Sequence, residues 1–354
     1  MVESLIQHPY KEFPFEFASE RYPPTGQLPG NAYLFPAILT QLADSAACSG
    51  AAFVRYFPAS NEVSFEYVSG LWKDYAGSHF PAREDVADLF IHAGQITDGN
   101  RGKSVGFDLF KEIPTTIKSI VFTPIATTRM SIEALWVVRD YPFNEFETRH
   151  ILELGDALAN IIYLSDGGAR QKMGLEEKVR AFSHLLFVCD PPTYHHSTRL
   201  VPWVEATSRL MGVKGSETVK IRRGTLLHDF GKIAIPKKII YKPAEFTPEE
   251  WAVMKQHPEL GARILKSYLG LHSVAEIVQT HHEKYDGSGY PAGMIGEEIP
   301  LAARILSVVD AYGAMTEDRV YRKTCGHASA VAEIKRCAGT DFDPRVCDAF
   351  LRLF

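Results

Sequence analysis

Seven residues that can bind a metal ion lie in the second half of the chain, within segments that are otherwise apolar. They are His196, His228, Asp229, His257, His281, His282 and Asp310. A single histidine on a helix is most often a satisfied core residue. Seven buried polar groups without partners would instead cost several kcal/mol each. Convergence on metal satisfies all of them together, so the sequence predicts a metal centre.

The donor types indicate the metal. Five imidazoles, two carboxylates and no thiolate form a nitrogen and oxygen set that suits transition metals rather than calcium. If Asp229 bridges, the seven residues supply eight bonds, four to each of two ions. Two six-coordinate ions then keep room for a bridging hydroxide and two phosphate oxygens, which is the layout of two-metal phosphoester hydrolysis. We expect two divalent transition metal ions, with Fe or Mn favoured and Zn, Co or Ni as alternatives.

Helices must position these residues, because residues 178–354 have an almost entirely helical pattern. Helix-start signals stand at Thr247 and Ser273, each with a capping-box glutamate, at Pro300, and at Asp343 before a proline. This half has 24 basic and 20 acidic residues and nine of the 13 histidines, whereas the net charge of the whole chain is −5. The basic balance predicts that the second half handles an anion.

The first half has a different pattern, and 354 residues suggest two domains. Prolines make residues 1–29 irregular, and residues 30–165 predict a helix, two β-hairpins and an exit helix. The exit helix, 145–164, has an apolar stripe, through which we expect a homodimer. Glycines end this helix, and we take residues 166–177 as a linker.

Several classes of protein are disfavoured. The chain has no apolar run of the ~18 residues that cross a bilayer and no signal-peptide pattern at its start, so we expect a cytoplasmic protein. We expect neither a membrane nor DNA as a partner. The five cysteines form no CxxC pair, which argues against a disulfide framework and a thiolate zinc site.

The segments that carry the seven residues have the order and spacing of a known family. They are HHSTRL (195–200), LLHDFGKIAIPKKIIYKP (226–243), MKQHPELGARIL (254–265), HHEKYDGSGYPAGMIGEEIPLAARI (281–305) and VVDAYGAMTEDRVYRK (308–323). On these segments, residues 178–354 resemble HD-GYP domains, the HD-superfamily phosphohydrolases that hydrolyse cyclic dinucleotides. Residues 30–165 resemble a GAF domain in the order of their elements. The expected fold is an α+β GAF-like domain followed by an all-α HD-GYP helical bundle.

The resemblance implies a role for each site residue. One metal would be held by His196, His228, Asp229 and Asp310, and the other by Asp229, His257, His281 and His282. Lys232 would contact the scissile phosphate, and Arg319 and Arg322 the substrate phosphates. Gly289, Tyr290 and Pro291, the GYP loop, would either line the dinucleotide site or position partner proteins.

Two positions depart from the family. Pro192 stands where some relatives have a glutamate for a third metal, so we expect a binuclear site. Without the third metal, the linear dinucleotide is the expected main product, with further hydrolysis to the mononucleotide left open. Val320 replaces the usual proline beside Arg319, which bears on substrate affinity or base preference.

Three functions remain open. The first is a phosphodiesterase regulated by the GAF-like domain, with cyclic di-GMP as the favoured substrate and cyclic GMP-AMP as the competitor. The second is a module that binds the dinucleotide or recruits partners without turnover. The third is a hydrolase of other phosphoesters. Whether the GAF-like domain binds a ligand is also open.

Overall fold

The computed structural model describes residues 31–43, 48–82, 90, 92–97, 117–127, 130–165, 174–317 and 326–354. The chain forms two compact units, Met1–Gln171 and Lys172–Phe354. The division between them falls within the predicted linker 166–177. The predicted irregular segment 1–29 lies outside the described residues.

The N-terminal unit contains an antiparallel sheet of six strands in the order β3-β2-β1-β6-β5-β4. Its elements are α1 (Asn31–Ala43), β1 (Gly50–Phe57), β2 (Glu62–Gly70), η2 (Lys73–Tyr75), β3 (His79–Pro81), β4 (Gly94–Thr97), β5 (Ser119–Thr127), β6 (Ile132–Arg139) and α3 (Glu145–Ser165). The predicted hairpins are confirmed, because β1 pairs with β2 and β5 with β6 as antiparallel neighbours. β1 is buried at seven successive positions, so both of its faces are covered. A GAF-like identity remains a prediction.

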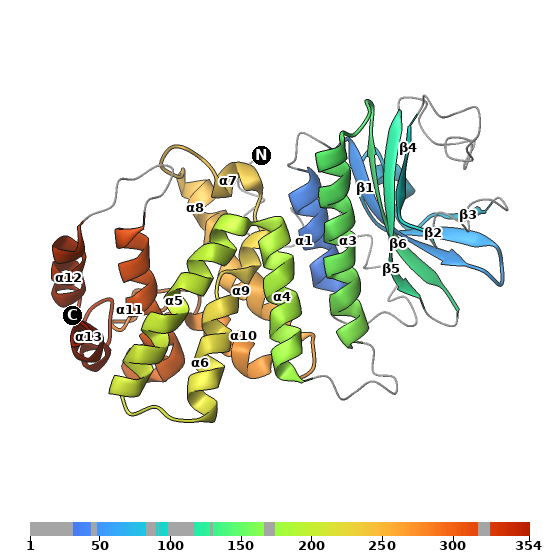
Figure 1. Ribbon diagram of the computed structural model, residues 1–354. Helices are drawn as coiled ribbons and strands as arrows, with labels where there is room; N and C mark the ends of the chain where they lie inside the picture. Colours follow the sequence, from blue (N-terminus) through green and yellow to red (C-terminus); the bar gives the residue numbers. More distant parts are fainter. Residues whose placement is uncertain are drawn as a thin grey trace. The chain divides into compact units, whose positions relative to one another are not determined.

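Both helices cover one face of this sheet (Figure 1): α1 packs on β1 and β2, and α3 on β5 and β6. Phe35 of α1 stacks on Phe53 of β1 with ring centroids 3.9 Å apart. Gly155 of α3 lies directly over Thr123 of β5, where a Cβ atom would come within 2.2 Å of the threonine side chain. The opposite face carries an aromatic core that includes Phe65 and Trp136.

The apolar stripe of α3 requires a correction. Its side chains are exposed by no more than 6 % in the single chain. They are Ile151, Leu154, Leu158, Ile161 and Ile162. The stripe is therefore a core face, and the prediction of a dimer interface through it is wrong. The homodimer itself stays a prediction without an assigned surface.

The C-terminal unit is helical throughout its described residues. Its elements are α4 (Leu175–Cys189), α5 (Pro191–Leu210), α6 (Ser216–Leu227), η4 (Phe230–Ala234), α7 (Lys237–Ile240), α8 (Pro248–Met254), α9 (His257–Lys266), α10 (His272–Thr280), η5 (Gly296–Glu298), α11 (Leu301–Thr316), α12 (His327–Arg336) and α13 (Pro344–Leu351). No helix in the described part of the chain is long and apolar enough to cross a membrane.

Most predicted helix starts are confirmed. Thr247 caps α8 through a capping box, and the Asp343 side chain accepts a hydrogen bond from the Arg345 N–H at the start of α13. Ser273 does not cap α10, which begins one residue earlier at His272.

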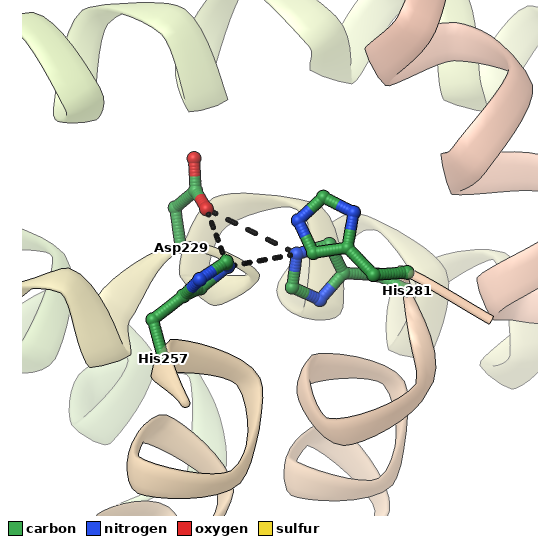
Figure 2. Close-up of side chains that lie close together, drawn as sticks. Asp229, His257 and His281 are labelled. Carbon is green, nitrogen blue, oxygen red and sulfur yellow. Dashed lines mark hydrogen bonds and ion pairs between the residues drawn. The ribbon is translucent and has the colours of Figure 1, made fainter. Parts of the chain in front are cut away.

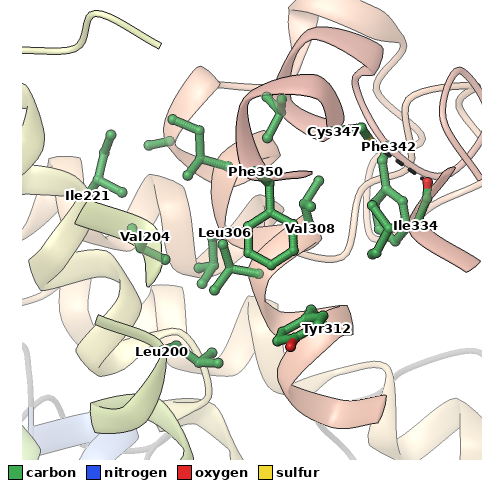
Figure 3. Close-up of a cluster of buried hydrophobic side chains, with 14 of the residues drawn as sticks. Leu200, Val204, Ile221, Leu306, Val308, Tyr312, Ile334, Phe342, Cys347 and Phe350 are labelled. Atoms are coloured by element: carbon green, nitrogen blue, oxygen red, sulfur yellow. Dashed lines mark hydrogen bonds between the residues drawn. The ribbon is translucent and has the colours of Figure 1, made fainter. Parts of the chain in front are cut away.

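A core cluster surrounds α11 (Figure 3). Leu306, Val309 and Tyr312 of α11 belong to it, together with Leu200 of α5 and Phe350 of α13. Because α5 and α11 each carry one predicted ligand, this core fixes the two helices on which His196 and Asp310 stand.

Candidate metal centre

The seven predicted ligands form two groups of atoms, each compact enough to hold an ion. The first group is His196, His228 and Asp310, and the second is Asp229, His257, His281 and His282. Within each group, the potential ligand atoms all lie within 4.8 Å of one another. The grouping matches the division that the resemblance implies, apart from Asp229, whose second contact is described below.

Most of these residues stand where a helix begins or ends. His228 follows α6, and Asp229 precedes η4. His257 is the first residue of α9, and His281 follows α10. Side chains at helix ends can converge on one point from several directions, which the side of a single helix does not allow.

Two glycines bring the segments of the second group together. A Cβ atom on Gly231 would lie 1.8 Å from the His257 carbonyl oxygen and 2.6 Å from the Gly261 nitrogen. One on Gly261 would lie 2.8 Å from the Gly231 nitrogen. Only residues without side chains permit this approach, and it places η4, which follows Asp229, against the start of α9.

Asp229 divides its two carboxylate oxygens between the groups. Its Oδ1 lies 3.2 Å from His257 Nε2 and 3.9 Å from His281 Nε2 (Figure 2). Its Oδ2 lies 3.3 Å from His228 Nε2. A carboxylate in this position can contact two ions at once, one through each oxygen.

Main-chain contacts determine which ring nitrogen faces the centre. The Nδ1–H groups of His228, His257 and His281 donate to the carbonyl oxygens three residues earlier, at 2.8, 2.8 and 2.7 Å. A carbonyl can only accept, so in the neutral ring each Nε2 carries a lone pair. Acceptors that bind the other ring nitrogen orient metal-bound histidines in this way.

The resulting lone pairs test whether a metal fits. His228 Nε2 is buried and has no hydrogen-bond partner among the described residues. His257 Nε2 and His281 Nε2 face each other at 3.4 Å, although two lone pairs cannot form a hydrogen bond. The Asp229 carboxylate adds further acceptors beside them. Acceptors that converge without a shared proton leave a position for a cation, so the donor set fits a metal ion.

His196 differs from these histidines because carboxylates contact both of its ring nitrogens. Its Nε2 lies 2.7 Å from Asp310 Oδ1, and its Nδ1 lies 2.9 Å from Glu317 Oε2. Glu317 also accepts hydrogen bonds from Arg199 at 2.8 and 3.0 Å. Sequence reasoning missed Glu317. The only available signal is an acidic residue seven positions after Asp310, at the end of the same helix.

The pKa values separate the two groups. Burial would lower the pKa of His196, but its hydrogen bonds with Asp310 and Glu317 outweigh burial and raise this pKa to about 9. Burial and then the neighbouring His257 lower the pKa of His282 to about 3. Burial, followed by the other histidines, holds the pKa of His281 well below its usual value. His281 and His282 are thus neutral near pH 7, the form that binds metal.

Lys232 lies one turn after Asp229, as predicted. Its Nζ donates to Asp229 Oδ2 at 2.6 Å. Burial alone would raise the pKa of Asp229, but the charge of Lys232 and the contacts with His228 and His257 hold it well below its usual value. The carboxylate therefore stays ionised.

The GYP loop packs on the second group. The Tyr290 ring stacks on the His282 ring with centroids 4.9 Å apart. The main-chain N–H of Tyr290 donates to the His282 carbonyl oxygen. A Cβ atom on Gly289 would lie 2.2 Å from the Lys284 nitrogen, so this position requires glycine. The buried Glu283 carboxylate, a second residue missed in the sequence, accepts from the N–H groups of Ala292 and Met294.

The predicted substrate-binding residues are only partly described. The loop residues Gly289, Tyr290 and Pro291 lie beside the second group, and Pro291 follows a cis peptide bond. Arg319, Val320 and Arg322 lie outside the described residues. Pro192 is exposed in the first turn of α5.

Comparison with known proteins finds similarity in the helical unit. Residues 180–346 match the family model of the HD domain. A cyclic di-GMP phosphodiesterase of Vibrio cholerae is 46 % identical over 132 residues, or 35 % of this chain and 27 % of that protein. One of Thermotoga maritima is 40 % identical over 167 residues, or 46 % of this chain and 45 % of that protein.

A third relative is named for a different substrate. The 3′3′-cGAMP-specific phosphodiesterase 2 of Vibrio cholerae is 37 % identical over 158 residues, or 44 % of this chain and 30 % of that protein. The chain spans less than half the length of each of these three relatives. The matched part of the helical unit is therefore similar to an HD domain.

Proposed function

We propose that the helical unit is a metal-dependent phosphodiesterase of the HD-GYP type that hydrolyses a cyclic dinucleotide. One observation carries the proposal: the Asp229 carboxylate lies between two groups of ligands, with one oxygen toward each. Two divalent ions there would supply an activated water and neutralise charge on the reacting phosphate. The activities for which the relatives are named support this reaction.

The proposal assigns each residue a role. His196, His228 and Asp310 hold the first ion, and His257, His281 and His282 hold the second, with Asp229 bridging. Lys232 is partly exposed beside Asp229 and contacts the scissile phosphate. Arg319 and Arg322 bind the remaining phosphates as guanidinium groups do. Tyr290, beside His282, lines the dinucleotide site.

We favour cyclic di-GMP as the substrate and the linear dinucleotide pGpG as the main product. Cyclic GMP-AMP is the alternative, because relatives named for either substrate are similar to this chain. We further propose that the protein acts in the cytoplasm, that the N-terminal unit regulates the helical unit as a GAF-like sensor, and that the chain forms a homodimer.

The test is to purify the protein without oxygen, quantify its metals and incubate it with each cyclic dinucleotide, resolving the products by chromatography. We expect two ions per chain and a linear dinucleotide. His281→Ala should abolish turnover. His272→Ala, which changes an exposed histidine at the start of α10, should keep it. Saturable binding without product at full metal occupancy would overturn the enzyme in favour of a binding module.

A further inference from the structure

The hydrogen-bond acceptor that orients the His196 ring differs from those that orient His228, His257 and His281. For His228, His257 and His281, the acceptor of the Nδ1–H is a main-chain carbonyl three residues earlier. For His196, the acceptor is the side chain of Glu317, which is 121 residues away in the chain. One histidine of the centre therefore depends on a distant carboxylate for its orientation.

Contacts on two sides hold Glu317 in place. Its N–H donates to the Gly313 carbonyl at 2.9 Å, which fixes the residue at the end of α11. Its carboxylate accepts from Arg199 Nε at 2.8 Å and from Arg199 Nη2 at 3.0 Å. Arg199 stands three residues after His196 on α5, so one helix supplies both the histidine and the arginine that directs the carboxylate to it.

The chemistry of this contact favours metal binding at the far side of the ring. A carboxylate at Nδ1 keeps a proton on that nitrogen, so a bound metal ion would displace the proton that Nε2 shares with Asp310. Nε2 points at Asp310 Oδ1, 2.7 Å away, within the first ligand group. A carboxylate partner also raises the basicity of a ligating imidazole, and loss of such a partner weakens metal binding.

We propose that Glu317 is a positioning residue: through His196 it orients and strengthens the first metal position, while the second position does not depend on it. This inference rests on the metal centre of the proposed function. An exposed ion pair between Glu317 and Arg199 that did nothing more would have a small effect on stability and none on one ion in particular. Selective loss of one ion distinguishes the two roles.

The experiment compares the wild type with Glu317→Ala and Glu317→Gln. Metal-free full-length protein is titrated with Co²⁺, with bound metal measured by equilibrium dialysis and the visible absorption recorded. Glu317→Ala should keep one tight ion and bind the other about 10- to 100-fold more weakly. In Glu317→Gln, the affinity for this ion should lie between those of the wild type and Glu317→Ala, because the amide oxygen still accepts from the His196 Nδ1–H. The absorption of one Co²⁺ should change and that of the other persist.

The matched control is Glu333→Gln, which removes a carboxylate paired with Arg336 on α12. It should bind both ions like the wild type. Thermal unfolding of the metal-free proteins reports whether the fold is retained. Two ions of unchanged affinity in Glu317→Ala would overturn the inference alone, as would equal weakening of both ions. A wild type that binds no divalent ion would overturn the proposed function and this inference with it.

Discussion

The two ligand groups share Asp229 but are held in place by different means. In the second group, His257 and His281 are 24 residues apart, and main-chain carbonyls orient both rings. In the first group, His196 and Asp310 are 114 residues apart, and side chains from α5 and α11 orient each other. His257 and His281 thus depend on local backbone geometry, as does His228 of the first group, whereas His196 and Asp310 depend on how two distant helices pack.

The two groups should therefore be sensitive to substitutions in different parts of the helical unit. Substitutions in the backbone crossing of η4 and α9 should disturb the second group. Substitutions on α5, α11 or their supports should disturb the first. A change at the shared carboxylate should disturb both.

The largest expected effect is that of Asp229→Asn. The amide retains the shape of the buried side chain but loses the charge that both groups face. We expect phosphodiesterase kcat/KM to fall by about 10²–10³-fold or more, with both ions weakened. Activity assays with metal analysis by mass spectrometry check this. Loss of only one ion would show that Asp229 does not bridge.

A pair of glycine substitutions sharpens the contrast between the groups. In Gly231→Ala, the new methyl group meets the rigid His257 carbonyl at 1.8 Å, and we expect a loss of about 3 kcal/mol or more in unfolding free energy. In Gly313→Ala, it meets the end of the Leu200 side chain at 2.6 Å, which can move, so we expect a smaller loss. Urea unfolding of both variants measures the difference. Equal losses would contradict the distinction between backbone and side-chain support.

The contact between α11 and the start of α13 predicts that the stability of the fold depends on pH. Arg304 of α11 donates to the buried Asp343, the N-cap of α13, at 2.6 Å. Burial alone would raise the pKa of Asp343, but hydrogen bonds from Arg345 and Arg304 outweigh it and keep this pKa below its ordinary value. The folded state therefore binds this proton less readily than the unfolded state. The stabilisation is present above about pH 4 and is lost as the pH falls through the native pKa.

Asp343→Asn tests this dependence. We expect a loss of about 1.5–3 kcal/mol in unfolding free energy at pH 7, the range for hydrogen bonds to a charged group. The difference from the wild type should shrink as the pH is lowered below 4, which urea unfolding at several pH values would follow. A constant difference would mean that the charge of Asp343 is not the stabilising feature.

The smallest expected effect is that of Arg199→Ala. The Arg199 side chain is 60 % exposed, and water can replace it as a donor to Glu317. We expect unfolding free energy to change by no more than about 1 kcal/mol. The first ion should weaken less than in Glu317→Ala, as measured by Co²⁺ titration. A loss as large as that of Glu317→Ala would make Arg199 the main determinant of the His196 contact.

Much of the centre could be predicted because metal ligands have chemically distinctive types and stand at recognisable places in the helical pattern. The seven residues were identified in the sequence, and the structure brings them into two groups. The roles of these residues, the number of ions and the substrate remain predictions. Glu317 and Glu283 were missed, because an acidic residue near a helix end or in a loop is common and has no periodic signal.

The sequence by itself determined the helical character of the second half, the hairpins of the first half and the residue types of the metal centre, since these follow from local periodicity and side-chain chemistry. Only the tertiary structure decided that the stripe of α3 is buried, that Gly231 meets the start of α9, and that Glu317 reaches His196. The reason is physical. Such contacts join residues far apart in the chain, and helix packing rather than the propensity of any one segment brings them together.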